Sequence, residues 1–397
     1  MKTIITAISC LLLLNACKKQ DDFIPIKSNN TSSLSTSKKI YFNQPGNWVD
    51  HNFSYNAGDT FVLTAGIDYT YFSMANIHDV TFINEGGIVK MLNGFNFNSC
   101  TNIKITGTGS ADFYGFEISS HTAGDVGVDI NGKSSRITCN NIFIHDKTYG
   151  FWVKQETGGT CDDGLYYPNW YMDSISIYNC LIKRMSQEGM YLGSTGQNAD
   201  RANSCGMYAY PMRLSNVSVH DVIIDSTGRG GIQLSGADKG SNKIYHNTIT
   251  RCGYELNSYQ GNGIVIGGNA YADIDNNKIR NTLCDGIWVL GNGTIRVRNN
   301  NIDSSGWLDK TYAGFMHGIA FDARPSYPFK LSTFRIRNNT IGRHTDACDI
   351  YIYNTMQNNN GVTLSGFSTK NNLIYNNNKG KAIIATQPGI FYSTTPN

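Results

Sequence analysis

Gly263-Ile264-Val265-Ile266-Gly267 and Gly286-Ile287-Trp288-Val289-Leu290 are the stretches that decide the fold, because their pattern recurs along the chain. Further copies read GFWVK at 150–154, GMYLG at 189–193, GIQLS at 231–235, GIAFD at 318–322 and DIYIY at 349–353. Apolar residues at every second position are typical of a strand with one buried face. Repetition of one short unit indicates a solenoid, in which each unit stacks on the next.

A second recurring stretch, with Asn or Asp between apolar residues, measures the repeat independently. It reads ITCNNIFI at 137–144, ISIYNCLI at 175–182, VSVHDVII at 217–224, ADIDNNKI at 272–279 and FRIRNNTI at 334–341. As register marks we take Asn141, Asn179, Asp221, Asn247, Asn277, Asn300, Asn339 and Asn372. The shortest interval, from Asn277 to Asn300, equals the interval from Gly263 to Gly286, which is about 23 residues. A turn of this length with two or three short strands predicts a parallel β-helix, whose longer turns carry loop insertions.

In such a helix, inward Ile and Val residues stack, and the Asn amides hydrogen-bond from one turn to the next. An Asn ladder is also a feature of pectate lyase-like β-helices, and the chain resembles that superfamily from about residue 60 to about residue 390. The resemblance implies an all-β, right-handed parallel β-helix solenoid of about 10–11 turns, and it selects no enzyme family. We assign 40–397 to this single domain, with 40–59 as its N-terminal cap, and expect 380–397 to close the other end.

Residues 1–16 have the pattern of a lipoprotein signal peptide. A basic start precedes an apolar run from Ile4 to Leu14 that is too short to span a bilayer. The following Asn15-Ala16-Cys17 resembles a bacterial lipobox, so we expect cleavage before Cys17 and lipidation of its thiol. The alternative is an ordinary secretory signal with an incidental cysteine.

Residues 17–39 are polar and read as a flexible tether. Within them, Asp21-Asp22 resembles the export signals of Bacteroidota surface lipoproteins. We therefore expect an outer-membrane lipoprotein, attached through its N-terminal lipid, that faces the periplasm or the cell surface.

The charge balance limits the classes of binding partner that we expect, and the cysteines bear on the cellular compartment. With 33 basic and 30 acidic residues the net charge is +3, so we expect no nucleic-acid partner, and we expect a monomer. Cys139 and Cys180 fall at inward strand positions, where a free cysteine is a small core residue. Cys161 and Cys205 lie in two polar insertions and are the best candidates for a disulfide in an exported protein.

Side-chain alternation in the recurring strand puts one residue per turn on its outer face. This predicted outward column is Trp152, Tyr191, Gln233, Val265, Trp288, Ala320 and Tyr351. Aromatic faces stack on sugar rings, and small residues leave room for a polymer. We therefore predict that a polysaccharide binds to Trp152, Tyr191, Gln233, Trp288 and Tyr351. The alternative is that these aromatics pack under the inserted loops.

Charged residues of three adjacent turns, Lys154, Glu188 and Arg229, are the first catalytic candidates, with Asp162 and Asp163 on a neighbouring insertion. A cation beside a uronic acid carboxylate, with a base for the α proton, would support β-elimination. Glu188 with one of the two aspartates would instead support glycoside hydrolysis. A surface patch of salt bridges is the structural alternative.

Asp285 and His317 belong to successive turns and form the second candidate pair, suited to proton transfer. A hydrogen-bonded structural histidine at a bend is the alternative. Asp162 and Asp163 could also hold calcium, the one cofactor that we consider.

These features predict a cell-surface, carbohydrate-active β-helix protein that degrades an extracellular polysaccharide, by β-elimination or by glycoside hydrolysis. The alternative is a non-catalytic glycan-binding or structural surface lipoprotein, since a fold does not by itself imply a function. A lyase requires a cation beside a base, a hydrolase requires two facing carboxylates, and a binder requires only the aromatic residues.

Overall fold

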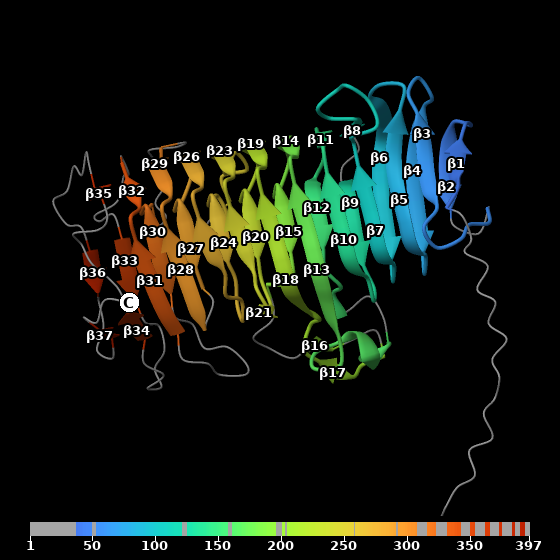
Figure 1. Cartoon of the computed structure of the whole chain (residues 1–397). Coiled ribbons are helices and arrows are strands. Elements are labelled where there is room, and N and C mark those ends of the chain that lie inside the picture. The colour runs from blue at the N-terminus through green and yellow to red at the C-terminus, as the bar shows by residue number, and fades with distance from the viewer. Residues whose placement is uncertain are drawn as a thin grey trace, which may run out of the picture. The chain divides into compact units, whose positions relative to one another are not determined.

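The computed structural model describes a domain built almost entirely of strands. Its described residues are 37–49, 53–120, 125–157, 161–195, 201–202, 205–257, 259–290, 293–307, 316–322, 332–342 and 350–353, with four short strands nearer the C-terminus. The strands lie side by side in long stacks, from β1 to the C-terminal strands (Figure 1). In this part of the chain, no helix has the length and apolar character needed to cross a membrane.

Three stacks of strands form the walls of the domain. The first stack contains β1 (Lys39–Phe42), β3 (Thr60–Thr64), β5 (His78–Glu85), β7 (Thr101–Thr106), β10 (Ser135–Asn140), β13 (Tyr171–Tyr178), β18 (Arg213–His220), β22 (Lys243–Tyr245), β25 (Asp273–Asp275), β28 (Thr294–Arg298), β31 (Ser332–Arg337), β34 (Val362–Ser365) and β37 (Ile390–Ser393), with β21 (Ala237–Lys239) beside β18. The second stack contains β2 (Gly46–Val49), β4 (Tyr69–Ala75), β6 (Val89–Asn98), β9 (Val126–Asn131), β12 (Tyr149–Val153), β15 (Met190–Leu192), β20 (Ile232–Leu234), β24 (Ile264–Ile266), β27 (Ile287–Val289), β30 (Ile319–Asp322), β33 (Ile350–Tyr353) and β36 (Ile383–Ala385).

The third stack is shorter. It contains β8 (Phe116–Ser119), β11 (Ile142–His145), β14 (Leu181–Met185), β19 (Ile223–Thr227), β23 (Thr248–Cys252), β26 (Lys278–Thr282), β29 (Asn301–Ser305), β32 (Thr340–Ile341) and β35 (Leu373–Ile374). Outside the stacks lie a 3-10 helix, η3 (Asp163–Leu165), and an antiparallel pair, β16 (Arg201–Ala202) and β17 (Tyr208–Ala209).

Strands within each stack pair in parallel, for example β24 with β27 and β27 with β30, so the predicted parallel β-helix is confirmed. The first stack runs to thirteen strands, which is more than the 10–11 turns that we predicted. The reason is that pairing already begins at Lys39, which lies opposite Thr60, so strands extend through the segment expected to be a cap. At the other end, β37 pairs with β34, and most of 380–397 lies outside the described residues.

Inward side chains of the three stacks form one continuous core. Ile232, Ile264 and Ile287 occupy the same position in consecutive turns, and each is fully buried. Cys139 and Cys180 are buried free cysteines, as predicted. The predicted disulfide between Cys161 and Cys205 is also confirmed.

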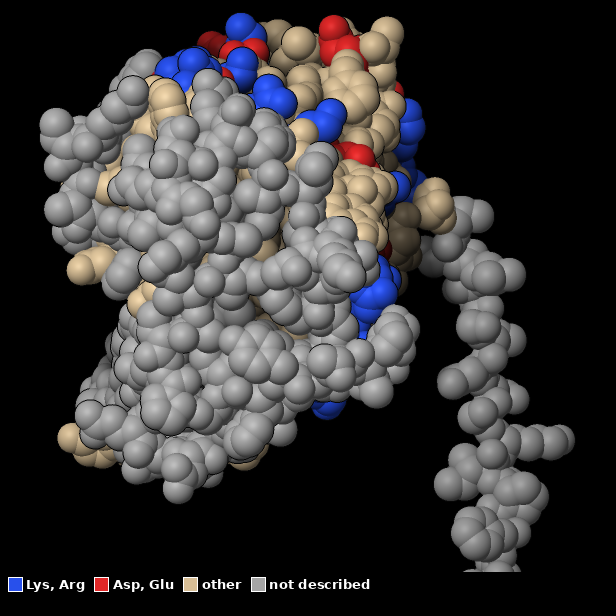
Figure 2. All heavy atoms as spheres, turned by 90° about the vertical axis from the view of Figure 1, so that its left-hand side faces the viewer, with Lys and Arg blue, Asp and Glu red and all other residues tan. Residues whose placement is uncertain are grey.

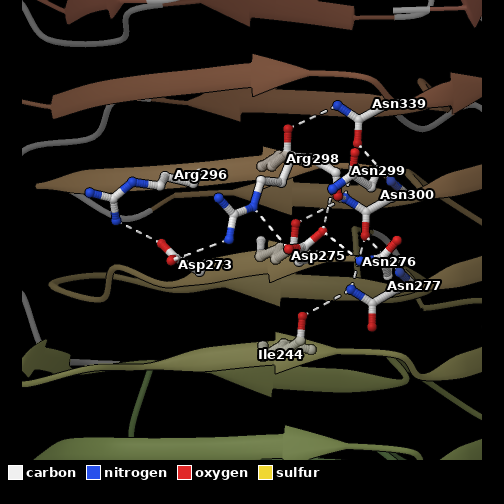
Figure 3. A network of polar contacts seen from close by, with 12 residues as sticks. Ile244, Asp273, Asp275, Asn276, Asn277, Arg296, Arg298, Asn299, Asn300 and Asn339 are labelled. Carbon is white, nitrogen blue, oxygen red and sulfur yellow. Dashed lines mark hydrogen bonds and ion pairs between the residues drawn. The ribbon is translucent and has the colours of Figure 1, made fainter. Parts of the chain in front are cut away.

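Buried asparagines at the bend between the first and third stacks form a ladder (Figure 3). The amide nitrogen of Asn247 donates to the Oδ1 of Asn277 at 3.0 Å, that of Asn277 to Asn300 at 2.9 Å, and that of Asn300 to Asn339 at 2.9 Å. Each accepting Oδ1 also receives the backbone N–H of the asparagine one turn earlier, at 3.0 Å. These bonds satisfy polar groups that would otherwise be costly to bury.

The register marks in the earlier turns are one position off this ladder. Asn141, Asn179 and Asp221 have φ angles of 57°, 51° and 52°, and strand pairing aligns them with Asn276, which precedes ladder residue Asn277. The ladder position in those turns holds the buried apolar residues Ile142, Cys180 and Val222. The error arose because Asn and Asp also favour left-handed backbone, so two adjacent polar positions looked equivalent.

Charged side chains on the outer face of the first stack pair across neighbouring strands. Arg296 contacts Asp273 at 2.8 Å, and Arg298 contacts Asp275 at 2.9 Å (Figure 3). Seen from the C-terminal end, the described surface carries Lys and Arg interspersed with Asp and Glu (Figure 2). Such exposed pairs add little to the free energy of unfolding.

The glycine at the start of the central strands of the second stack, from β9 to β27, is required by close approach and not by its φ angle. A Cβ on Gly263 would lie 2.6 Å from the carbonyl oxygen of Gly286 and 2.5 Å from Cγ2 of Ile279. A Cβ on Gly231 would lie 2.7 Å from the Gly263 carbonyl oxygen. The close contact between one turn and the next therefore explains why glycine recurs at this position in the sequence.

Two neighbouring glycines allow a matched test of this contact. We expect Gly231→Ala to lower the free energy of unfolding by about 2 kcal/mol or more, because overpacking against backbone cannot relax easily. The control is Gly230→Ala, whose Cβ would meet nothing closer than 3.4 Å. The measurement is the urea midpoint followed by tryptophan fluorescence, and equal losses for the two variants would contradict the explanation.

Candidate functional site

Strand pairing confirms the predicted outward column on the second stack. Trp152 lies opposite Tyr191, Tyr191 opposite Gln233, and the register continues through Val265, Trp288 and Ala320 to Tyr351. The structure extends the column in the other direction through Asp129, Asn96 and Ser73. The column differs in character between its C-terminal half and its N-terminal half.

In the C-terminal half, the column is packed and not open. Trp288 is only 9% exposed and forms a buried cluster with Val265, Leu290 and Ala320, against which Tyr351 packs. The alternative that we weighed for the aromatics, packing, therefore applies to Trp288. Tyr351 is half-buried and stacks on the ring of His317 at 4.6 Å.

Asp285 and His317 do touch, but they serve the backbone at a bend. The Nδ1 of His317 lies 3.1 Å from the Oδ1 of Asp285, and the same oxygen accepts the His317 backbone N–H at 2.7 Å. The backbone N–H of Asp285 donates in turn to Asn262 Oδ1 at 3.0 Å. The two side chains are almost fully buried, so they form a second, shorter bend ladder in place of an accessible proton-transfer pair.

In the N-terminal half, three partly exposed rings gather in what we call the aromatic cluster, Tyr149, Trp152 and Tyr191. The Trp152 ring centroid lies 4.5 Å from that of Tyr149 and 5.1 Å from that of Tyr191. The ammonium of Lys154 sits 3.8 Å from the Trp152 centroid and 3.5 Å from the Tyr191 centroid, and 2.5 Å from Glu156 Oε1. Lys154 is therefore a buried cation held by cation–π contacts and one ion pair.

Glu188 and Arg229, predicted to lie near Lys154, adjoin the aromatic cluster. Glu188 is buried, and its Oε2 has no hydrogen-bond partner among the described residues. Burial raises the pKa of Glu188, while the charges of Arg229 and Lys154 oppose that shift. Arg229 is paired with Glu255. Burial also raises the pKa of Tyr149 to about 12.

The remaining predicted residues lie at the edges of this region. Gln233 follows Tyr191 in the column and is half-buried. Asp162 is exposed and lies 3.2 Å from the ammonium of Lys133, and Asp163 begins η3. The described residues contain no group of three or more His, Cys, Asp or Glu side chains placed to hold a metal ion, so calcium stays a prediction.

An open hollow of about 440 Å³ lies beside the aromatic cluster, at a position that we did not predict from the sequence. It is lined by Asn47, Thr70, Tyr71, Asn93, Phe95, Asn96, Asp125, Val126 and Asp129, and we call it the Asp129 pocket. Asp129 is the column residue directly opposite Trp152. The signal was present in the sequence, because GVDIN at 127–131 is another copy of the recurring strand, with Asp129 at its outward position.

Asp129 is the most perturbed carboxyl of the pocket. Burial raises its pKa to about 6, although a hydrogen bond from Asn131 opposes the shift. Its Oδ1 is buried and has no hydrogen-bond partner among the described residues. The neighbouring Asn96 is held in place, since its Nδ2 donates to the Tyr71 hydroxyl at 2.8 Å. Asp129 thus keeps its proton to a higher pH than an exposed aspartate does.

A second carboxyl, that of Asp125, lines the same pocket and is anchored from behind. Its Oδ2 accepts a hydrogen bond from Ser120 Oγ at 2.5 Å and lies 3.8 Å from the ammonium of Lys147. Lys147 also donates to the carbonyl oxygen of Leu92 at 2.7 Å, and its side chain is fully buried. Burial lowers the pKa of Lys147 to about 8. The pocket therefore holds two carboxyls in different environments.

No family model and no curated protein sequence matches the chain. Among solved structures, it is similar to the A-module of the mannuronan C-5 epimerase AlgE4 of Azotobacter vinelandii, at 14% identity over 85% of this chain and 91% of that chain, with a TM-score of 0.37. It is similar to the periplasmic alginate epimerase AlgG at 11% identity over 87% of this chain and 83% of that chain, with a TM-score of 0.41. It is also similar to the Dettilon tailspike protein, at 12% identity over 85% and 60% of the two chains and a TM-score of 0.33. At this level of likeness we draw no conclusion about chemistry.

The pKa of Asp129 predicts that its ionisation opposes folding. Because the pKa rises from 3.8 to about 6 on folding, the protonated carboxyl favours the folded state below pH 4, and this contribution is lost as the pH rises through 6. At pH 7.5 we therefore expect Asp129→Asn to be more stable than the unaltered protein, by about 2–3 kcal/mol at most. This gain should disappear near pH 4.

Urea unfolding of both proteins between pH 4 and pH 8 measures this difference. The control is Asp68→Asn, which removes one negative charge at an exposed position outside the pocket. If the free energies of unfolding of Asp129→Asn and of the unaltered protein changed with pH in parallel, the pKa of Asp129 would not be raised by burial, and the explanation would be contradicted.

Proposed function

We propose that the chain binds an extracellular polysaccharide along the outward column from Asn96 to Tyr191 and hydrolyses a glycosidic bond in the Asp129 pocket. The observation that carries this proposal is the position of Asp129. A carboxyl with a pKa of about 6 lies in an open pocket and, through strand register, directly beside the ring of Trp152.

Asp129 suits the role of general acid. A carboxyl with a pKa of about 6 keeps its proton in mildly acidic solution and can give that proton to the glycosidic oxygen as the bond from this oxygen to the anomeric carbon breaks. Asp125 is the second carboxyl that hydrolysis requires. Anchored by Ser120 and Lys147, it would take a proton from the water molecule that attacks the anomeric carbon.

The aromatic cluster supplies the neighbouring sugar site. Adjacent strands of the second stack are about 4.8 Å apart, so a polymer that crosses the turns would pass from Asp129 to Trp152 and then to Tyr191. The exposed ring edges and faces there suit contact with sugar rings. A chain bound in this way would be held on one side of the scissile bond.

Hydrolysis is better supported than β-elimination, because the cations of this face already have carboxylate partners. Lys154 is paired with Glu156, and Arg229 is paired with Glu255. Lys147 has a lowered pKa that would suit a base, but its ammonium is fully buried behind Asp125. An elimination needs a cation free to neutralise the carboxylate of its substrate.

Digestion of a panel of neutral and acidic polysaccharides tests the proposal. We expect new reducing ends without the ultraviolet absorbance of unsaturated products. Asp129→Asn and Asp125→Asn should each lower the turnover at least ~100-fold, whereas Asp68→Asn should keep it. Unsaturated products would establish a lyase instead. Binding without any cleavage would establish the glycan-binding alternative.

We also propose that the chain is an outer-membrane lipoprotein anchored through Cys17, on the sequence pattern at 14–17. Metabolic labelling with a fatty-acid analogue and membrane fractionation in a Gram-negative host test this. Cys17→Ser should lose the label and leave the membrane fraction, whereas Cys10→Ser, within the apolar run, should keep both. Unchanged processing of Cys17→Ser would favour the ordinary secretory signal.

A further inference from the structure

We propose that the Asp129 pocket accepts an uncharged sugar and discriminates against sugars that carry a carboxylate. This inference rests on the proposed function, since it names the substrate class of the same site. It argues against β-elimination of a uronic acid polymer, which was one of the two reactions that the sequence predicted.

The chemistry of the pocket lining is the first support. Donors and acceptors come from the amides of Asn47, Asn93 and Asn96 and from the hydroxyls of Thr70 and Tyr71. The only ionisable carboxyls of the lining are Asp125 and Asp129, and no Lys or Arg belongs to it among the described residues. Amides, hydroxyls and carboxylates together bind sugar hydroxyls well, because a hydroxyl both donates and accepts.

Three lysines of the neighbouring segments give the second support, because each of them already has a partner. Lys147 donates its hydrogen bond to the Leu92 carbonyl and lies beside Asp125. Lys154 contacts Glu156, and Lys133 contacts Asp162. A uronate entering the pocket would therefore have to displace an existing carboxylate in order to gain a cationic partner.

Electrostatics adds a cost for an anionic sugar. A carboxylate placed beside Asp125 would meet like charge in a partly desolvated hollow, where repulsion is screened less than in water. A neutral sugar avoids this cost. It can also lay its apolar face on Val126, the partly exposed apolar residue of the lining.

The amide of Asn96 is held in one orientation by two neighbouring side chains. Its Nδ2 donates to the Tyr71 hydroxyl, and its Oδ1 faces the Nδ2 of Asn131 at 3.4 Å. With its amide fixed by two neighbours, Asn96 keeps one orientation next to Asp129 in the column. One Nδ2 hydrogen and one lone pair of Oδ1 are left for a ligand, and a sugar hydroxyl can use both because it accepts and donates.

A matched pair of polymers tests the inference. Polygalacturonate and alginate are compared with their carboxyl-reduced forms, which keep the linkages and lose the charge, alongside neutral xylan, mannan and β-glucan. Binding is measured on Asp129→Asn, which cannot complete the reaction, and cleavage on the unaltered chain. We expect binding and cleavage to favour the uncharged member of each pair by at least ~10-fold.

The outcomes separate this inference from the proposed function. Preferential binding of neutral polymers without cleavage would leave the inference standing and overturn the hydrolase. Cleavage that favours the carboxylated polymers would keep the hydrolase and overturn the inference.

A designed cation provides a second, independent readout. Asn93 lines the pocket and is half-buried at its edge, so Asn93→Lys would place an ammonium in a lining that has none. We expect this variant to gain at least ~10-fold in affinity for polygalacturonate, with the gain lost at high salt, whereas Asn93→Gln should gain nothing. An Asn93→Lys variant with unchanged preference would show that sugars do not enter the pocket, and the inference would fail.

Discussion

The close contact between a glycine in one turn and a carbonyl oxygen in the next is the constraint on which the rest of the structure depends. Because a Cβ on Gly263 would fall 2.6 Å from the Gly286 oxygen, only glycine lets these turns approach at this bend. The contact sets the register of the second stack, and register decides which side chains become neighbours on its outer face. The placement of Asp129 beside Trp152 follows from that register.

Most buried polar side chains at the bends are used by the fold itself. Asn277 and Asn300 bond to the turns before and after them, and Asp285 with His317 does the same at the other bend. Asp129 and Glu188 differ, since each has a buried oxygen with no hydrogen-bond partner among the described residues. A buried polar group without a hydrogen-bond partner lowers the stability of the fold, and carboxyls of this kind are common in active sites.

The periodicity of the sequence predicted much of the fold and part of the candidate site. The alternation in 263–267 and 286–290 predicted the parallel β-helix and the outward column in its correct register. The polar insertions predicted the Cys161–Cys205 disulfide. The Asn marks failed in the early turns, because a left-handed bend residue such as Asn179 and a ladder residue such as Asn277 select the same amino acids. A sequence pattern alone cannot distinguish a position that needs a left-handed backbone from one that needs a buried amide, because Asn is favoured at both.

The sequence by itself therefore determined the repeat, the inward and outward faces and the identity of the column, because these depend on local alternation and on the length of one turn. Only the tertiary structure decided which column residues are open and which are packed. Trp152 and Trp288 are equivalent in the pattern, yet one borders a pocket and the other is buried in an apolar cluster. It also decided that Lys154 and Arg229 are held by Glu156 and Glu255, whereas the buried Oδ1 of Asp129 has no hydrogen-bond partner among the described residues. The reason is that burial, charge pairing and the volume of a pocket arise from residues of several turns, whose distances and packing depend on the loops between them.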